Sequence, residues 1–354
     1  MSQRRRLIIT VFSSIDDVGT SLLSAAAPRN IPVEVIGDES LGGFGGTVNF
    51  DPTKLSSATK EKLAQAEALV TEPSVLAQLL QDNSSCLPKL KWCQSTYAGV
   101  DPLFDAANSN KLQLPLPFIL TRFAGKFGLP IAEWCLARII GHERNFALTA
   151  QDQQQQAWAK SRHVTRYRYL KDLTLTILGG AGDIGICIGR AAKAFGMNVI
   201  AFGRSPRHIM EEGTGNDVMD EYTTDLSTAL KEADYIVSCL PSTPHTRGLL
   251  SGDALMAAKK GAVFLNVGRG DVLDESSLIR ALGQGYTSAA ILDVFATEPL
   301  PPESPLWNRP DVIVSPHVSG VTRAEDVPDI VLENYQRYVD DKDLLFQVDW
   351  SKGY

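Results

Sequence analysis

The sequence has few cysteines, no long apolar segment and no excess of positive charge. Its five cysteines, among 354 residues, include no Cys-x-x-Cys pair, which argues against a disulfide framework or a zinc site and favours a reducing, cytoplasmic compartment. No apolar run approaches the ~20 residues of a membrane helix. A net charge of −7 argues against general affinity for nucleic acid or anionic membranes. An anionic ligand must therefore be captured by local positive groups.

Strand-like apolar runs instead alternate with stretches of helical period along the whole chain, which is typical of α/β proteins with parallel sheets. Strands are predicted to begin at Leu7, Val33, Ala68, Leu90 and Phe118, and again at Leu173, Val199, Tyr235, Ala262, Ala289 and Val312. Between the two sets, one helix over 128–150 is predicted, with one face that carries Leu129, Ala132, Leu136, Ile139 and Ile140. This helix is expected to cross between domains or to dimerise.

A glycine-rich turn directly follows the strand predicted from residue 173. It contains Gly-x-Gly-x-x-Gly at Gly180, Gly182 and Gly185, and a helix and a second strand follow it. In this context the three glycines allow a tight turn, close approach of a pyrophosphate, and close packing of the helix. The helix N-terminus, at Asp183 and Ile184, offers N–H groups and a positive dipole end to phosphates. The motif therefore predicts a dinucleotide-binding domain.

The turn after the second strand predicts NADP as the preferred cofactor, with NAD as the alternative. An NAD-binding domain carries an acid ~20 residues after the glycines, where it bonds the ribose 2′-hydroxyl, but the first carboxylate here is Glu211. The strand ends in a basic turn instead. Arg204 with Ser205, and also Arg207, can pair with a 2′-phosphate, which a carboxylate would repel. A solvated basic turn without a ligand is the other interpretation.

Three polar residues, Arg269, Glu298 and His317, each follow a predicted strand, where a doubly wound sheet places its ligand crevice. They are far apart in the sequence and can meet only in the fold. Taken singly, each is better explained by a surface charge or a structural histidine. Their presence in this order behind a phosphate-binding turn indicates a common site.

In the segments around these residues, and in Pro241–Arg247, the chain resembles the D-2-hydroxyacid dehydrogenase family, most strongly over about 173–320. The resemblance implies a catalytic triad of Arg269, Glu298 and His317. The chemistry of 2-oxo acid reduction agrees, because His317 can donate a proton near neutral pH. Glu298 can fix the tautomer of that imidazole, and Arg269 can bind the anionic substrate and polarise its carbonyl. No metal is expected.

The resemblance also implies further cofactor contacts, with Asp293 placed at the nicotinamide carboxamide. The positions concerned are Cys239, Pro241, Val267, Asp293 and Gly320. Simple core packing explains Cys239 equally well.

In the N-terminal part, the segment Ser95–Asp101 resembles the loop whose main-chain N–H groups hold the substrate carboxylate in that family. Tyr97, Ala98 and Gly99 are the matching positions. Arg122 lies in a segment similar to the glyoxylate/hydroxypyruvate reductase branch, where an arginine would assist anion binding. A surface or hinge role is the alternative for Arg122.

Together these patterns predict two doubly wound, parallel-sheet α/β domains. A Rossmann nucleotide domain over 122–319 is expected to be inserted into a flavodoxin-like substrate domain made of 1–121 and 320–354. The expected function is NADPH-dependent reduction of a small 2-oxo acid, such as glyoxylate or hydroxypyruvate, to the D-2-hydroxy acid by a cytoplasmic homodimer. Two alternatives stay open, a nucleotide-sensing corepressor and a dehydrogenase of larger 2-oxo acids or phosphite.

Overall fold

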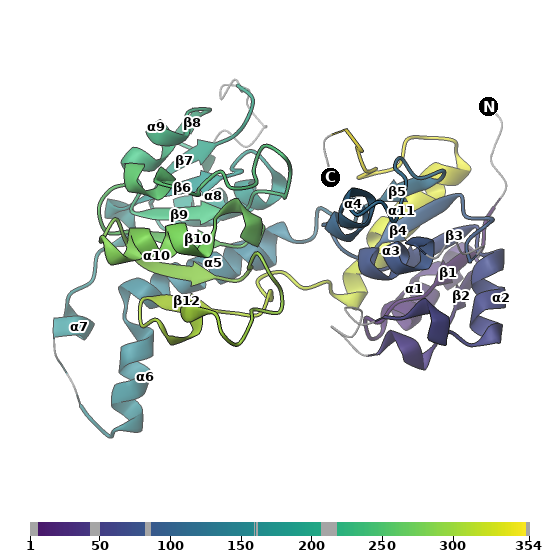
Figure 1. Cartoon of the computed structure of the whole chain (residues 1–354), viewed down its shortest axis with the longest axis horizontal. Coiled ribbons are helices and arrows are strands. Elements are labelled where there is room, and N and C mark those ends of the chain that lie inside the picture. Colours follow the sequence, from purple (N-terminus) through teal and green to yellow (C-terminus); the bar gives the residue numbers. More distant parts are fainter. Residues whose placement is uncertain are drawn as a thin grey trace. The chain divides into compact units, whose positions relative to one another are not determined.

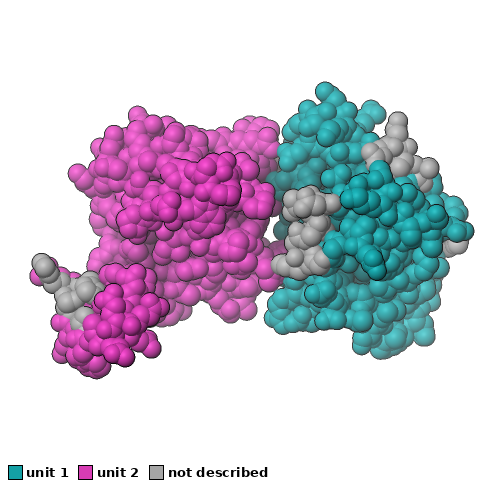
Figure 2. Space-filling view, turned by 60° about the horizontal axis from the view of Figure 1, so that its bottom comes forward, with its two compact units in different colours: residues 1–126, 322–354 teal, residues 127–321 magenta. Residues whose placement is uncertain are grey.

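The computed structural model describes residues 6–42, 50–81, 86–158, 160, 162–206 and 218–351, with the elements labelled in Figure 1. The chain forms two compact units, distinguished by colour in Figure 2. Unit 1 comprises residues 1–126 and 322–354, and unit 2 comprises residues 127–321. This division differs by a few residues from the expected one, so that Arg122 lies in unit 1.

Unit 1 is a five-stranded parallel sheet in the order β2-β1-β3-β4-β5, the flavodoxin-like order that the sequence predicts. Its strands are β1 (Ile9–Val11), β2 (Val33–Val35), β3 (Ala68–Thr71), β4 (Trp92–Ser95) and β5 (Ile119–Thr121). Its helices are α1 (Val18–Ala26), α2 (Ser57–Gln65), α3 (Pro73–Gln81), α4 (Asp101–Asn108) and α11 (Val327–Val339). Helix α1 packs beside α11 and α3 beside α4. All residues of β3 and β4 are buried, as expected of a parallel sheet covered on both faces.

The C-terminal segment of the chain completes unit 1. Gln347 pairs with Thr121 in an antiparallel bridge, and the Val348 N–H donates to the Leu120 carbonyl over 2.9 Å. Strand β5, at the edge of the parallel sheet, is thereby covered by the last described residues, which removes an open sheet edge.

Unit 2 is a seven-stranded parallel sheet in the order β12-β11-β10-β9-β6-β7-β8. Its strands are β6 (Thr174–Leu178), β7 (Asn198–Phe202), β8 (Glu221–Thr223), β9 (Tyr235–Ser238), β10 (Ala262–Asn266), β11 (Thr287–Leu292) and β12 (Val312–Val314). Its helices are α5 (Gly128–Glu143), α6 (Phe146–Gln154), α7 (Arg162–Thr165), α8 (Asp183–Ala194), α9 (Leu226–Lys231) and α10 (Glu275–Gly283). The order reverses between β6 and β9, so the switch point of a doubly wound sheet lies there. The predicted α/β fold class is confirmed.

The predicted strands all occur, each beginning within two residues of its expected position. Strand β8 was not predicted, because its three residues are exposed or only half-buried at the sheet edge and carry no apolar run. In the described part of the chain, no helix has both the length and the apolarity needed to cross a membrane.

The single helix predicted over 128–150 is wrong. It is two helices, because Asn145 between α5 and α6 adopts a left-handed backbone with φ 53°, a conformation that ends a helix. On the predicted apolar face, Leu129 is 66% exposed. Ile131 and Cys135 are buried together with Ala132, Leu136 and Ile139, and α5 packs along α8.

Candidate active site

The glycine turn connects β6 to α8 in unit 2, and its glycines serve different purposes. A Cβ on Gly180 would lie 2.6 Å from the Ala201 Cβ, and one on Gly185 would lie 2.5 Å from the Gly179 carbonyl oxygen. The fold itself therefore requires glycine at 180 and 185. A Cβ on Gly182 would meet nothing nearer than 3.4 Å, so chain packing permits a side chain there. The bare backbone at Gly182 fits the close approach of a phosphate.

The N-terminus of α8 supports the same interpretation. Gly182 precedes the helix, and no side chain caps it. The N–H groups of a first helical turn, including those of Asp183 and Ile184, lack partners within the helix and favour an anion at this end.

The turn after β7 carries the candidate 2′-phosphate group. Arg204 and Ser205 are exposed, and the Tyr222 hydroxyl donates to the Ser205 carbonyl over 2.8 Å. No acidic side chain occurs over 203–206. These residues fit NADP, whereas the third predicted contact, Arg207, lies outside the described residues.

The loop after β10 presents Arg269 and is shaped by Asn266. The Asn266 side-chain amide donates to the Arg269 carbonyl over 2.9 Å and accepts from the Gly268 N–H over 3.2 Å. Gly270 lies so close to the Phe295 backbone that any Cβ there would overlap it. The loops after β10 and β11 are therefore in direct contact.

Glu298 and His317 form a hydrogen-bonded pair between the loops after β11 and β12. The His317 Nδ1 and a Glu298 carboxylate oxygen lie 2.8 Å apart, and the other oxygen accepts from the Phe295 N–H over 2.9 Å. Burial raises the pKa of Glu298, but the hydrogen bond and charge of His317 and the charge of Arg269 together hold it below its usual range. The structure thus brings the three predicted residues together. The His317 side chain is 45% exposed, so its ring remains accessible.

Asp293, directly after β11, is fully buried beneath the His317 loop. Its carboxylate accepts hydrogen bonds from the Ser315 hydroxyl and from the Val318 and Ser319 N–H groups. A contact between Asp293 and the nicotinamide stays a prediction.

The remaining cofactor positions of unit 2 lie at the same sheet edge or against α5. Cys239 follows β9, its thiol donates to the Leu178 carbonyl over 3.2 Å, and burial raises its pKa to about 12. Pro241 is exposed and Val267 is buried. A Cβ on Gly320 would lie 2.8 Å from the Ile131 side chain of α5, so a larger residue at 320 would have to displace that side chain.

In unit 1, Tyr97, Ala98 and Gly99 follow β4 in a half-buried loop. The Ser95 hydroxyl donates to the Tyr97 carbonyl over 2.8 Å and accepts from the Tyr97 N–H over 3.0 Å, which fixes the turn. The Arg122 guanidinium donates to the Ala98 carbonyl over 3.4 Å. The structure therefore brings Arg122 to the predicted carboxylate-binding loop.

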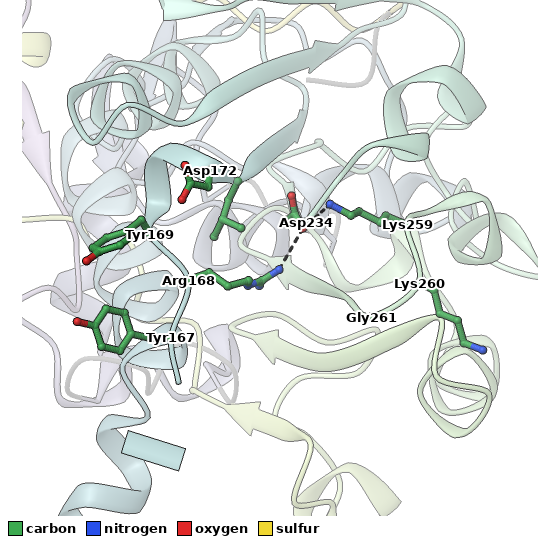
Figure 3. Close-up of a pocket in the computed structure, with 9 residues that line it drawn as sticks. Tyr167, Arg168, Tyr169, Asp172, Asp234, Lys259, Lys260 and Gly261 are labelled. Carbon is green, nitrogen blue, oxygen red and sulfur yellow. Dashed lines mark hydrogen bonds and ion pairs between the residues drawn. The ribbon is translucent and has the colours of Figure 1, made fainter. Parts of the chain in front are cut away.

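A cavity of about 360 Å³ in unit 2 lies away from all these residues (Figure 3). Its lining includes Leu173, Asp234 and Gly261, which directly precede β6, β9 and β10. Asp234 accepts from Arg168 over 3.0 Å and from Lys259 over 2.9 Å. Because the cavity lies at the amino ends of the strands, whereas ligands of such sheets bind at the carboxyl ends, we assign this ion cluster to structure.

The sequence pattern assigned no role to Asn266, Ser315 or Ser319, which shape the loops that carry Arg269 and His317. A polar residue at the end of a buried strand is the available signal, because a buried polar side chain needs a partner and often finds it in the adjoining loop.

Comparisons with known proteins agree with this geometry. The model of the family "D-isomer specific 2-hydroxyacid dehydrogenase, NAD binding domain" matches residues 136–319. Glyoxylate/hydroxypyruvate reductase A from Serratia proteamaculans is 32% identical over 247 residues, which cover 70% of this chain and 76% of that protein. The protein of the same name from Yersinia enterocolitica is 29% identical over 288 residues, which cover 80% and 89%.

Solved structures match almost the whole chain. A D-isomer specific 2-hydroxyacid dehydrogenase family protein from Aeromonas salmonicida has a TM-score of 0.80 and 32% identity, and the match covers 98% of this chain and 100% of that one. The NADPH-dependent glyoxylate/hydroxypyruvate reductase from Sinorhizobium meliloti, solved with NADP and sulfate, has a TM-score of 0.76 and 25% identity, with coverage of 98% and 100%. The chain therefore belongs to the D-isomer specific 2-hydroxyacid dehydrogenase family and is an NAD(P)-dependent oxidoreductase.

Proposed function

We propose that this enzyme reduces a small 2-oxo acid, glyoxylate or hydroxypyruvate, to the D-2-hydroxy acid, with NADPH as the preferred reductant. The observation that carries the proposal is the hydrogen-bonded pair of Glu298 and His317 beside Arg269 at the carboxyl edge of the dinucleotide-binding sheet. The names of the relatives from Serratia and Yersinia support this substrate class.

In this proposal, Arg269, Glu298 and His317 have different roles. A nicotinamide cofactor held by the glycine turn and the N-terminus of α8 would supply the hydride to the carbonyl carbon. His317 gives a proton to the carbonyl oxygen from Nε2, because its Nδ1 is held by Glu298. Arg269 pairs with the substrate anion and stabilises the charge that develops on the oxygen. We propose a further anion contact through the N–H groups at Tyr97, Ala98 and Gly99, supported by Arg122.

The cofactor proposal follows from the turn after β7 and from the glycine turn. Gly180, Gly182 and the N-terminus of α8 would hold the pyrophosphate. Arg204 and Ser205 would hold the 2′-phosphate through charge-assisted hydrogen bonds of ~1.5–3 kcal/mol each, which correspond to at least about a tenfold preference. Binding of NADP in the Sinorhizobium relative supports this choice.

Initial rates with NADPH and with NADH, across a panel of 2-oxo acids, test the proposal. We expect glyoxylate and hydroxypyruvate to be turned over best, and kcat/KM to favour NADPH at least about tenfold. The Arg204→Asp variant should lose that preference. Arg190→Asp makes the same charge change at an exposed position of α8 and should keep it.

Equal efficiency with both cofactors, or an Arg204→Asp variant that still prefers NADPH, would contradict the cofactor assignment. A preference for larger 2-oxo acids, or for oxidising phosphite, would replace the substrate assignment while leaving the family unchanged.

We also propose a homodimer that uses α6. This helix buries none of its residues within its own chain, and Phe146, Leu148 and Trp158 are 56%, 38% and 95% exposed. Phe146 and Leu148 lie on α6 and Trp158 follows it, and exposed large apolar side chains are a feature of interfaces. Helix α6 extends away from the sheet of unit 2 (Figure 1). Light scattering of the wild type and of Phe146→Asp tests this, and we expect the variant to be monomeric.

The cysteines are free, and a cytoplasmic location stays a prediction.

A further inference from the structure

We infer that Asp293 is a positioning residue for proton transfer, because its buried carboxylate folds the loop 315–319 into the shape that turns His317 toward Glu298. This inference rests on the proposed function, since Asp293 acts through the proton donor. It differs from the nicotinamide contact that the resemblance implies, because here Asp293 works through the protein chain.

The carboxylate of Asp293 accepts three hydrogen bonds from that loop. One oxygen accepts from the Ser315 hydroxyl over 2.6 Å and from the Val318 N–H over 3.0 Å, and the other accepts from the Ser319 N–H over 2.8 Å. Asp293 has no exposed surface, and Ser315 and Ser319 are each 5% exposed. Buried donors without an acceptor are costly, so the loop loses much of its stability if this carboxylate is removed.

The backbone of His317 explains why an anion is needed. His317 has a φ of 54°, in the left-handed region that a residue with a Cβ avoids. Such a residue lets successive N–H groups converge on one point, which forms a small anion-binding concavity. The N–H groups of Val318 and Ser319 converge on the Asp293 carboxylate in this way. The anion therefore stabilises the unfavourable backbone of the catalytic histidine.

Two acids thus hold His317 at different places. Glu298 holds the ring at Nδ1 over 2.8 Å. Asp293 holds the backbone, both through its carboxylate and through its carbonyl, which accepts the His317 N–H over 2.8 Å. The Asp293 N–H in turn donates to the Asn266 carbonyl over 3.0 Å, and Asn266 shapes the Arg269 loop. Asp293 therefore connects the loops after β10, β11 and β12.

Two substitutions separate this role from a cofactor contact. Asp293→Asn keeps the size of the side chain, but its amide group places a donor where the carboxylate accepts an N–H. Ser315→Ala removes one hydrogen bond to the carboxylate and leaves Asp293 itself in place. Both are compared with wild type and with His317→Ala in a double-mutant cycle on the rate of glyoxylate reduction, measured in single turnover with the full-length enzyme.

We expect Asp293→Asn to lower the rate about 100-fold and Ser315→Ala about 3- to 10-fold, with the KM for glyoxylate and the Kd for NADPH each changed less than about threefold. In the His317→Ala background, both substitutions should lower the residual rate less than about threefold, because residues that act as a unit are not additive. A crystal structure of Ser315→Ala should show a longer distance between His317 and Glu298.

Losses that multiply in the His317→Ala background would overturn the inference, and so would weaker NADPH binding at an unchanged rate. An unchanged rate in Ser315→Ala, in a loop that keeps its shape, would overturn it even if Asp293→Asn fails to fold. If His317→Ala itself retains wild-type turnover, the proposed proton donor is wrong as well. If His317→Ala lowers the rate as expected and the further losses multiply on its residual rate, only the role of Asp293 is removed.

Discussion

The carboxyl edges of the two sheets are built differently. At the edge of the seven-stranded sheet, side chains carry the chemistry, and Glu298 and His317 are joined by a 2.8 Å hydrogen bond. At the edge of the five-stranded sheet, the Ser95 hydroxyl fixes the loop after β4 by donating to the Tyr97 carbonyl, and the Arg122 guanidinium donates to the Ala98 carbonyl. The first arrangement suits proton transfer and the second suits holding an anion. Substitutions in the pair of Glu298 and His317 should therefore change kcat, and those in the unit 1 loop and at Arg122 should change KM.

The largest expected effect is that of His317→Ala in unit 2. Loss of a positioned general acid costs about 10²–10⁴ in rate, so we expect kcat for glyoxylate reduction to fall about 1,000-fold. Fluorescence titration should give an unchanged Kd for NADPH. A variant that loses cofactor binding in parallel with turnover would break the division between chemistry and binding.

Two glycines in the turn after β6 should separate fold from ligand binding. Gly185→Ala forces a Cβ to within 2.5 Å of the Gly179 carbonyl, and overpacking of this kind costs about 1–3 kcal/mol, so Tm should fall. Gly182→Ala meets no such contact and should leave Tm nearly unchanged while raising the Kd for NADPH about tenfold or more. Thermal melts and titrations of both variants measure this, and equal melting losses would contradict it.

Arg122→Gln tests unit 1. If Arg122 supports anion binding, loss of one charge-assisted contact of about 1.5 kcal/mol should raise the KM for glyoxylate about tenfold and change kcat by less than about threefold. Arg337→Gln on α11 removes an arginine that pairs with Glu333 over 2.8 Å on the helix surface and serves as the matched control. A fall in kcat for Arg122→Gln without a change in KM would break the comparison.

The smallest effect concerns pH. Burial raises the pKa of Glu298, but the interactions with His317, the Phe295 N–H and Arg269 outweigh burial and bring the pKa below the ordinary value of 4.5. The ionised carboxylate that holds His317 is therefore present above pH 4.5 and is lost only as pH falls through that lowered pKa. A profile of kcat/KM for reduction should show no loss assignable to Glu298 above pH 4.5. A fall in kcat/KM with decreasing pH that begins above pH 4.5 and is absent in Glu298→Gln would contradict this.

The difference between the two edges also explains what the sequence could predict. Arg269, Glu298 and His317 are specified by side-chain chemistry, so their residue types are visible in the sequence. The N–H groups at Tyr97 to Gly99 belong to every residue type except proline, so the unit 1 loop was identified only by resemblance. The parallel strands were predictable because burial on both faces makes them continuous apolar runs.

Local backbone geometry accounts for most of what the sequence did not reveal. The left-handed Asn145 divides the predicted helix into α5 and α6, and the apolar period alone does not show that this residue is left-handed. The hydrogen bonds of Asp293 depend on a left-handed His317, which no spacing in the sequence indicates. Both features become visible only when dihedral angles are known.

Because unit 1 is made of two separate stretches of the chain, the two units can fold at different times during synthesis. Unit 2 is one uninterrupted stretch, whereas unit 1 needs Tyr335 to donate to the Leu7 carbonyl over 3.1 Å and Asn334 to donate to Gln94 over 3.0 Å. On the ribosome, unit 2 can therefore fold before α11 has been synthesised, whereas residues 1–126 cannot complete unit 1 until α11 is available. A chain terminated before α11 should retain affinity for NADPH and yet be digested rapidly by protease within its leading 126 residues.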